Sequence, residues 1–266
     1  MRRILVFDSG LGGLTVARAL RAAGQGRVAI DYAADVAGFP YGDWEEEALR
    51  AHIVSLMGRL IDAARPDVVV VACNTASVIS LAALRAAHDV PFVGTVPAIK
   101  PAASRTRTGV IGVLATPGTV KREYTTALIH TFAFHCEVVL HGAPGLARMA
   151  EEKLAGHPVD PEALRREITP VFAKREGRAT DVVVLGCTHY PLLREEMERV
   201  APWPVSFIDP SPAIARRALE VAESCDDHGG IRGGRVFVTA SEERLCEVLK
   251  REGFGVMVVL QGPERG

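Results

Sequence analysis

Short runs of β-branched residues alternate with longer amphipathic stretches along the whole chain. In the longer stretches apolar side chains recur at three- and four-residue steps, as Leu49, Ile53, Leu56 and Leu60 do within residues 43–64. Such spacing is typical of a helix with one buried face. Regular alternation of strand and helix favours parallel sheets covered by helices. The pattern therefore predicts an α/β fold with mainly parallel sheets.

The predicted strands are short, and several are rich in valine. They cover residues 3–7, 27–32, 67–72, 91–94, 109–114, 136–140, 181–186, 205–208, 234–239 and 255–260. The predicted helices lie between them. They cover about residues 13–23, 43–64, 75–88, 117–131, 144–155, 161–175, 191–200, 211–224 and 241–251.

Two proline-containing segments, residues 94–97 and residues 202–204, are candidate hinges. Cutting the chain near them separates a central segment, 98–206, from the flanking segments 1–97 and 207–266. We therefore expect two α/β domains, of which the first is discontinuous because the chain enters it twice. A strand followed by a cysteine and then a helix occurs once in each, which suggests pseudo-symmetry.

The composition is that of an ordinary soluble globular protein. The 266 residues are 48% hydrophobic and 24% charged, and the formal net charge of −1 gives no overall attraction to nucleic acid or to an anionic membrane. Apolar runs stay below the roughly 18 residues that a membrane span needs. The apolar stretch after Arg3 ends at Asp8, so it predicts a first strand rather than a signal peptide. We expect a cytoplasmic protein.

The five cysteines do not form a disulfide or zinc pattern. Their number is odd, no CxxC pair occurs, and no cysteine and histidine cluster has the spacing of a structural zinc site, so we expect no metal. Cys136, Cys225 and Cys246 are interpreted as small apolar fillers.

Cys73 and Cys187 differ from the other cysteines because each directly follows a buried strand. Cys73 is followed by Asn74-Thr75, and Cys187 by Thr188-His189. Open α/β sheets bind ligands at the carboxyl ends of their strands. We expect each thiol to begin a helix, whose dipole favours the thiolate. A lone histidine after a strand is usually structural, but His189 is close enough in sequence to hold or supply a proton for Cys187. Two thiols that approach one site from two sides suit proton transfer between the two faces of a carbon.

A glycine-rich turn from Asp8 to Thr15 follows the first strand. Such turns often cradle phosphate, and Asp31 lies about where a ribose-binding acid would be. However, Thr15 stands where the dinucleotide fingerprint needs a third glycine, and Asp8 would repel a pyrophosphate. A tight turn in which Asp8 caps a helix is an open alternative. We favour backbone amides that bind a carboxylate while Asp8 faces an amine or a thiol.

A second loop combines glycine and proline with aromatic residues, in Phe39-Pro40-Tyr41-Gly42. Loops of this kind with exposed aromatics often carry function. An equally weighted alternative is a turn in which Tyr41 packs on a neighbouring helix.

Taken together, these motifs resemble those of bacterial glutamate racemases, in the cofactor-independent aspartate/glutamate racemase superfamily. The resemblance spans residues 3 to about 250, with the motifs in the right order. The matching motifs are Asp8-Ser9-Gly10-x-Gly12-Gly13, Pro40-Tyr41-Gly42, Ala72-Cys73-Asn74-Thr75-Ala76-Ser77, Thr116-x-Gly118-Thr119-Val120, Gly186-Cys187-Thr188-His189-Tyr190-Pro191-Leu192-Leu193 and Ile208-Asp209.

The resemblance implies two flavodoxin-like domains with the active site in the cleft between them. It implies interconversion of L- and D-glutamate for peptidoglycan synthesis, without a cofactor and in a homodimer. By motif match, Cys73 and Cys187 are the catalytic acid/bases, assisted by Asp8 and His189 respectively, and Glu151 falls where the family carries an acid near the second cysteine. The implied substrate-binding residues are Asp8, Ser9, Pro40, Tyr41, Gly42, Asn74, Thr75, Thr119, Thr188 and His189.

Three other interpretations stay open on the residues. The nearest is an aspartate racemase or another amino-acid racemase of the same superfamily, although the intact Asn-Thr and Thr-His pairs favour glutamate. The second is a nucleotide-dependent oxidoreductase that uses the glycine-rich turn. The third is a non-catalytic protein that keeps the fold to bind and inhibit a partner, and the retention of both cysteines argues against it.

Overall fold

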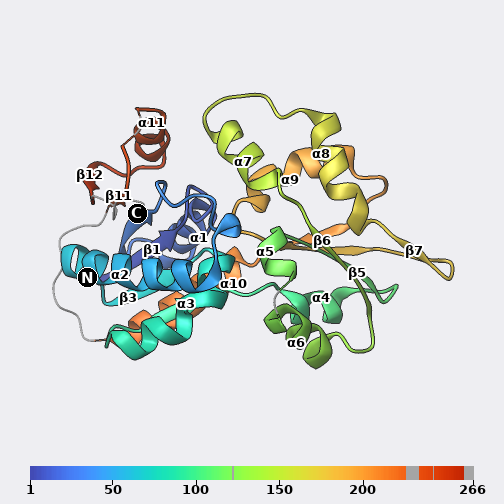
Figure 1. Ribbon diagram of the computed structural model, residues 1–266, viewed down its shortest axis with the longest axis horizontal. Helices are drawn as coiled ribbons and strands as arrows, with labels where there is room; N and C mark the ends of the chain where they lie inside the picture. The colour runs from blue at the N-terminus through green and yellow to red at the C-terminus, as the bar shows by residue number, and fades with distance from the viewer. Residues whose placement is uncertain (122, 226–233, 242, 261–266) are drawn as a thin grey trace. The chain divides into compact units, whose positions relative to one another are not determined.

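The computed structural model describes residues 1–121, 123–225, 234–241 and 243–260 (Figure 1). The chain forms two compact units, one from Met1–Thr95 with Ser211–Gly266 and the other from Val96–Pro210. No helix in the described part of the chain combines the length and the apolar character needed to cross a membrane.

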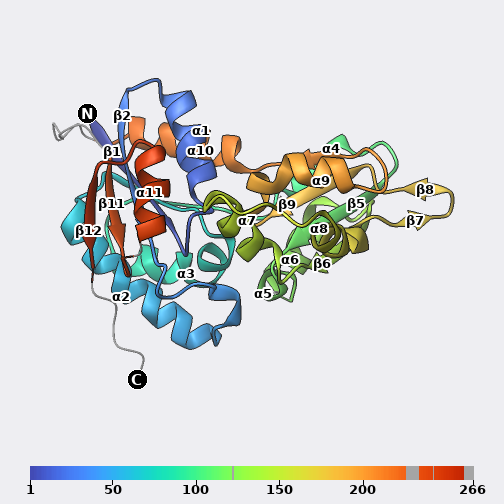
Figure 2. The ribbon, with the colours of Figure 1, turned by 90° about the horizontal axis from the view of Figure 1, so that it is seen from above.

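The first unit is built on a six-stranded sheet with the order β12-β11-β2-β1-β3-β4. All pairings between its described strands are parallel. Figure 2 shows β11 and β12 side by side, with α11 next to them. The strands are β1 (Arg2–Asp8), β2 (Val28–Ala34), β3 (Val68–Val71), β4 (Phe92–Gly94), β11 (Arg235–Val238) and β12 (Val256–Val259).

Helices cover both faces of this sheet. Helix α2 packs on α3, and α1 packs on α10, which also contacts β1 and β3. Because alternate strand residues point to opposite faces, Leu5 and Phe7 lie in the core beneath α2 and α3. The helices are α1 (Leu14–Gly24), the 3₁₀ helix η1 (Tyr41–Asp43), α2 (Glu46–Ala64), α3 (Asn74–Ala87), α10 (Ser211–Glu223) and α11 (Glu243–Arg251).

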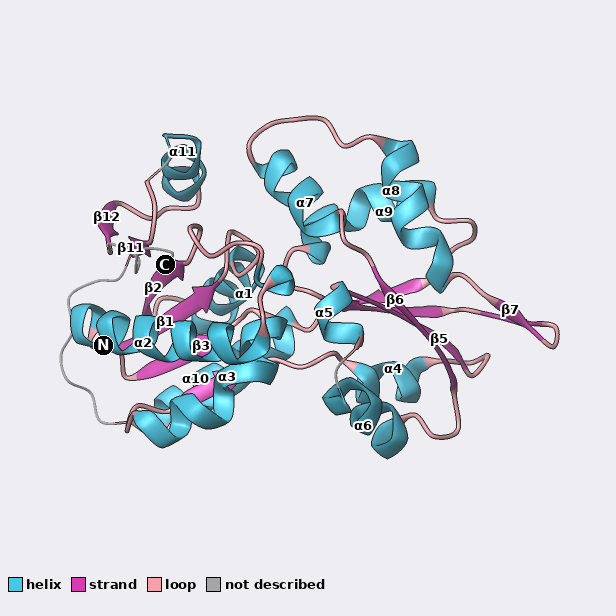
Figure 3. Ribbon diagram, in the orientation of Figure 1, coloured by secondary structure: helices cyan, strands magenta, loops and turns pink. Residues whose placement is uncertain are grey.

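The second unit has a four-stranded parallel sheet with the order β10-β9-β5-β6. Figure 3 shows two of these strands, β5 and β6, side by side. Its strands are β5 (Val110–Ala115), β6 (Glu137–Gly142), β9 (Val182–Gly186) and β10 (Ser206–Ile208). Its helices are α4 (Ile99–Arg105), α5 (Pro117–Val120), α6 (Glu123–Phe132), α7 (Leu146–Leu154), α8 (Pro161–Ile168), η2 (Thr169–Val171), η3 (Tyr190–Leu193) and α9 (Arg194–Val200).

The two sheets share one strand order. In the first unit the strands β2-β1-β3-β4 are neighbours, and in the second the strands β6-β5-β9-β10 repeat that order in chain sequence. Cys73 follows the third strand of its set, and Cys187 follows the third strand of the other. The expected α/β fold with mainly parallel sheets is thus confirmed.

The helix predicted over residues 161–175 is wrong in its second half. Helix α8 ends at Ile168, and a short antiparallel hairpin of β7 (Lys174–Arg175) and β8 (Arg178–Ala179) follows η2. The two residues between these strands, Glu176 and Gly177, both have positive φ, at 49° and 80°. Positive φ at both central residues matches the twist of a two-residue hairpin and is incompatible with a continuing helix.

Candidate active site

The first candidate site lies where β1 and β3 end. Asp8 is the last residue of β1 and is fully buried, and its Oδ1 accepts a hydrogen bond of 2.9 Å from the Gly10 amide. The Ser9 hydroxyl lies 3.7 Å from the sulfur of Cys73. Because Gly13, not Asp8, is the N-cap of α1, the alternative in which Asp8 caps a helix is wrong.

The glycine-rich turn itself is tightly packed. The Tyr32 hydroxyl donates to the Gly10 carbonyl at 2.7 Å. A Cβ atom at Gly13 would lie only 2.8 Å from the Cβ of Asp8 and 3.1 Å from the Tyr32 hydroxyl. Only glycine fits there without displacing Asp8, so the turn holds Asp8 and Ser9 in place beside Cys73.

Asn74 is the clearest sign that this edge of the sheet binds a ligand. It is the first residue of α3 and is only 3% exposed, yet neither its Nδ2 nor its Oδ1 has a hydrogen-bond partner. A buried polar group left unsatisfied costs about 1–3 kcal/mol. Thr75 beside it is also buried. The Asn74 amide is therefore oriented for a polar group that the protein itself does not supply.

Thr95 is a second such residue, which the sequence marked only as part of a hinge. It follows β4, whose Gly94 pairs with Val71 of β3, so Thr95 lies at the same sheet edge as Cys73. Its side chain is 2% exposed and its hydroxyl has no partner, while its backbone amide donates to Ser77. The signal in the sequence was its place directly after a buried parallel strand.

The loop of Pro40, Tyr41 and Gly42 lies at the start of α2. Pro40 precedes η1, and Gly42 is within it. Tyr41 is buried rather than exposed, so the expectation of an exposed aromatic is wrong for this residue. Its hydroxyl donates to Asp35 at 2.6 Å, and its ring packs edge-on against His52 of α2.

Asp35 is the centre of this loop's hydrogen bonds. Its carboxylate also pairs with the His52 imidazole and accepts a 2.7 Å bond from the Thr239 hydroxyl. Burial alone would raise the pKa of Asp35, but the hydrogen bonds from His52, Tyr41 and Thr239 bring it below its usual range. Burial, and next the Asp35 charge, raises the Tyr41 pKa well above the usual value, with smaller contributions from Cys73 and Asp8.

The second candidate site forms a chain of three side chains. The sulfur of Cys187 lies 3.8 Å from Nδ1 of His189, whose Nε2 lies 2.7 Å from Oε1 of Glu151 on α7. Cys187 and His189 are buried, as is Thr188 between them. In the tautomer whose Nε2–H donates to the Glu151 carboxylate, Nδ1 is left to accept from the thiol.

The expectation that Cys187 begins an α-helix is wrong. The 3₁₀ helix η3 begins at Tyr190, and α9 begins only at Arg194. Cys73, in contrast, is the N-cap of the 14-residue helix α3. The helix dipole therefore acts on Cys73, whereas the polar help for Cys187 comes from His189 and Glu151.

Thr119 occupies the place in the second unit that corresponds to the Asp8 turn. Thr116 follows β5 and caps α5, and its hydroxyl lies 2.9 Å from that of the buried Thr119. Each unit thus assembles its own polar set around its cysteine. The roles given to these residues in catalysis and substrate binding stay predictions.

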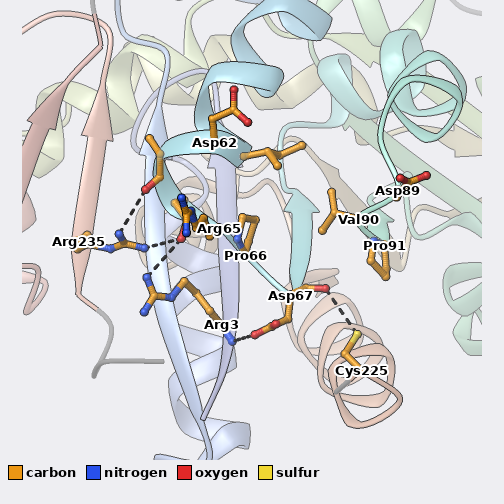
Figure 4. A pocket seen from close by; sticks show the side chains of 13 residues that line it. Arg3, Asp62, Arg65, Pro66, Asp67, Asp89, Val90, Pro91, Cys225 and Arg235 are labelled. Atoms are coloured by element: carbon orange, nitrogen blue, oxygen red, sulfur yellow. Dashed lines mark hydrogen bonds between the residues drawn. The ribbon is translucent and has the colours of Figure 1, made fainter. Parts of the chain in front are cut away.

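Asp31 does not serve a nucleotide. It lies inside β2, fully buried, and its carboxylate pairs with Arg235 at 2.6 Å and with Arg3 at 3.5 Å. A cavity of about 1130 Å³ lies beside these arginines, at the amino ends of the strands and thus at the sheet edge opposite Cys73 (Figure 4). Arg235, which lines this cavity, also donates to the carbonyl of Ala64, the last residue of α2.

Among the described residues no group of three or more His, Cys, Asp or Glu side chains is placed to hold a metal ion.

Comparison with known protein families identifies the family of this chain. The Asp/Glu/Hydantoin racemase family matches residues 14–218. The chain therefore belongs to this family, so it is an isomerase, and the resemblance drawn from its motifs is confirmed.

Proteins similar to this chain include glutamate racemases. The one from Agrobacterium fabrum is 56% identical, over 97% of this chain and 95% of its own. The one from Brucella abortus is 50% identical, over 96% of this chain and 93% of its own. The crystal structure of Escherichia coli glutamate racemase, in complex with L-glutamate and the activator UDP-MurNAc-Ala, is 40% identical with a TM-score of 0.91, covering 98% of each chain.

The Asp35 cluster predicts a pH-dependent stability. Because the folded pKa of Asp35 lies below the unfolded one, its stabilisation is complete above about pH 4 and is lost as the pH falls through the folded pKa. We expect Asp35→Asn to lower the free energy of unfolding by about 2 kcal/mol at pH 7, and the difference from wild type to shrink below about pH 4.

Urea denaturation of both proteins between pH 7 and pH 3 measures this difference. Asp62→Asn, at an exposed position of α2, the helix that carries His52, is the control and should follow the wild-type curve. A difference between wild type and Asp35→Asn that stays constant to pH 3 would contradict the prediction.

Proposed function

We propose that this protein is a glutamate racemase, which interconverts L- and D-glutamate with Cys73 and Cys187 as its two acid/bases. The identity of 50–56% to glutamate racemases over nearly the whole chain supports this activity. The observation that carries the proposal is the unpartnered, buried amide of Asn74 directly after Cys73. An amino-acid substrate has charged polar groups that such an amide can bind.

In this proposal the two units are the two predicted domains, whose expected limits near 97/98 and 206/207 lie two and four residues from the limits of the units. A single thiol cannot reach both faces of a substrate that is held in place. One cysteine from each domain, at the corresponding end of its sheet, serves one face each.

The chemical difficulty is the weak acidity of the α-proton. No cofactor is required as an electron sink if the site itself stabilises the charge that develops on the α-carboxylate. We assign this to donors from Ser9, Asn74, Thr75 and Thr188, all of which are buried. Preorganised donors in a site that excludes water lower the barrier far more than the same groups in water. Pro40, Tyr41, Gly42 and Thr119 complete the proposed substrate-binding set.

Proton transfer follows from the polar partners of each thiol. The Cys187 thiolate removes the α-proton of L-glutamate, and the Cys73 thiol delivers its proton to the opposite face, which leaves Cys187 protonated and Cys73 as thiolate. The reverse reaction starts from D-glutamate at Cys73. His189, held by Glu151, accepts or returns the proton of Cys187, and Asp8 assists Cys73.

We further propose that the enzyme acts in the cytoplasm as a homodimer and supplies D-glutamate for peptidoglycan, as the motif resemblance implies. The near-zero net charge gives no reason for a nucleic-acid partner. Aspartate or another amino acid is the alternative substrate within the same family.

The direct test is a circular-dichroism assay of the purified protein with L-glutamate, D-glutamate or L-aspartate and no added cofactor. We expect the signal of both glutamate enantiomers to decay to zero and that of L-aspartate to stay constant. Decay of the aspartate signal alone would move the assignment to an aspartate racemase. No decay with any of the three would refute the proposed activity.

The two-thiol mechanism predicts that removing either cysteine alone greatly reduces racemase activity. We expect Cys73→Ala and Cys187→Ala each to lower kcat by about 10²-fold or more, because each removes one of two required acid/bases. Deuterium incorporation from D₂O into both enantiomers is the measurement. Cys136→Ala is the control and should behave as wild type. If either active-site variant racemises at the wild-type rate, the two-thiol mechanism fails.

Replacing Asn74 should reduce activity without reducing stability. Asn74→Leu should lower kcat/KM for glutamate about tenfold or more, because a hydrogen bond to a charged group contributes about 1.5–3 kcal/mol. It should leave the free energy of unfolding unchanged or raise it, because the buried amide has no partner within the protein.

Steady-state kinetics and urea denaturation together check this prediction. Ser80→Ala is the control on the same helix, since Ser80 is buried but its hydroxyl is already satisfied by the Ala76 carbonyl at 2.7 Å. That variant should keep kcat/KM. A loss of stability in Asn74→Leu with unchanged kcat/KM would show that Asn74 has a structural role instead.

A further inference from the structure

Lys153 lies outside every motif, yet it joins α7 to the turn that carries His189. Its Nζ donates to the Leu192 carbonyl at 2.7 Å and pairs with Glu196 Oε2 at 2.8 Å. Leu192 belongs to η3, which directly follows His189, and Glu196 belongs to α9. One ammonium group therefore joins three elements of the second unit, α7, η3 and α9.

Lys153 stabilises the charged form of the Glu196 carboxyl. Burial would raise the pKa of Glu196, but the hydrogen bond and charge of Lys153, with the charge of Arg199, bring it below its usual range. The Glu196 side chain is 17% exposed and that of Lys153 32%. The pair is therefore better shielded from solvent than the exposed ion pairs on the same helix, such as Arg194–Glu198.

Glu151 and Lys153 hold α7 at two different points of its circumference. Successive residues of a helix are about 100° apart, so the two side chains leave α7 on nearly opposite sides, with the exposed Glu152 between them. Glu151 contacts His189 on one side, and Lys153 contacts Leu192 on the other.

The start of α7 is fixed separately. The Gly145 amide, at the N-cap, donates to Glu167 of α8 at 3.2 Å, and Leu146 and Ala150 are fully buried. These contacts fix the start and the buried face of the helix, and the contacts of Glu151 and Lys153 restrain the rotation of its second half. A rotation of about 20° moves a side-chain end at a radius of roughly 5–6 Å by about 2 Å. Such a shift breaks a 2.7 Å hydrogen bond like that of Glu151 with His189.

We propose that Lys153 is a positioning residue for the proton-transfer chain Cys187–His189–Glu151. It sets the rotation of α7, and thereby keeps the Glu151 carboxylate on the imidazole that serves the thiol. The inference rests on the proposed racemase function for its kinetic consequence, but its structural content concerns only the second unit.

The kinetic test compares Lys153→Met, Lys153→Arg and wild type. Lys153→Met should lower kcat for glutamate about tenfold with KM changed less than about twofold, because misalignment of a catalytic group slows the reaction without removing a substrate contact. Lys153→Arg, which keeps a cationic donor, should recover most of this loss. Arg199→Met removes another partner of Glu196 without touching α7 and should leave kcat unchanged.

Isotope effects separate positioning from a general loss of folded enzyme. Slower proton transfer at Cys187 should raise the primary isotope effect with α-deuterated L-glutamate and lower it with α-deuterated D-glutamate, since there Cys73 makes the isotope-sensitive abstraction. A smaller fraction of folded enzyme changes neither value. Unchanged isotope effects in Lys153→Met, or no recovery in Lys153→Arg, would overturn the proposal.

A measurement without substrate keeps this inference distinct from the proposed activity. In ¹⁵N spectra of the full chain, the Nε2 proton of His189 should be protected from exchange in wild type and Lys153→Arg, and should exchange faster in Lys153→Met. If wild type does not racemise glutamate but this difference is seen, the proposed function fails and the positioning role stands. Equal exchange in all three proteins refutes the role of Lys153.

Discussion

The pairing of the first and third strands in each sheet is the constraint on which both candidate sites depend. In the first unit β1 and β3 run in register from Ile4–Val68 to Phe7–Val71, and in the second β5 and β9 run in register from Ile111–Val182 to Ala115–Gly186. Because the strands are parallel, their carboxyl ends meet at one edge of the sheet. The pairing places the Asp8 turn beside Cys73, 65 residues further along the chain, and the Thr116 turn beside Cys187, 71 residues further along.

The same placement carries different chemistry in the two units. Cys73 caps a long α-helix and has the Ser9 hydroxyl near its sulfur. Cys187 precedes only a 3₁₀ turn, and an imidazole and a carboxylate take the place of the helix. A shared strand order thus fixes where each thiol lies, whereas local side chains decide how its proton is held. This division fits the proposed reaction, whose two directions start from mirror-image substrates.

Much of the fold could be predicted because valine runs and strand-end cysteines are local signals. The contacts that complete the sites are not local. Glu151 meets His189 only because α7 packs against η3, and nothing in the sequence around Glu151 indicates that helix rotation. The cluster of Asp35 with Thr239 joins residues 204 positions apart, which no periodicity can anticipate. The hairpin at Glu176–Gly177 was missed because a charged stretch after a helix resembles its continuation, whereas the positive φ of both residues ends it.

The discontinuous first unit has a consequence for synthesis on the ribosome. Residues 96–210 are synthesised as one uninterrupted stretch, so every strand of the second unit's sheet has been made before residue 211 is added. The first unit must wait, because β11 covers the edge of β2 and Arg235 completes the ion pairs of the buried Asp31. During that interval the β2 edge is open to chaperones or to a neighbouring nascent chain. The part of the protein that is translated first is therefore completed last.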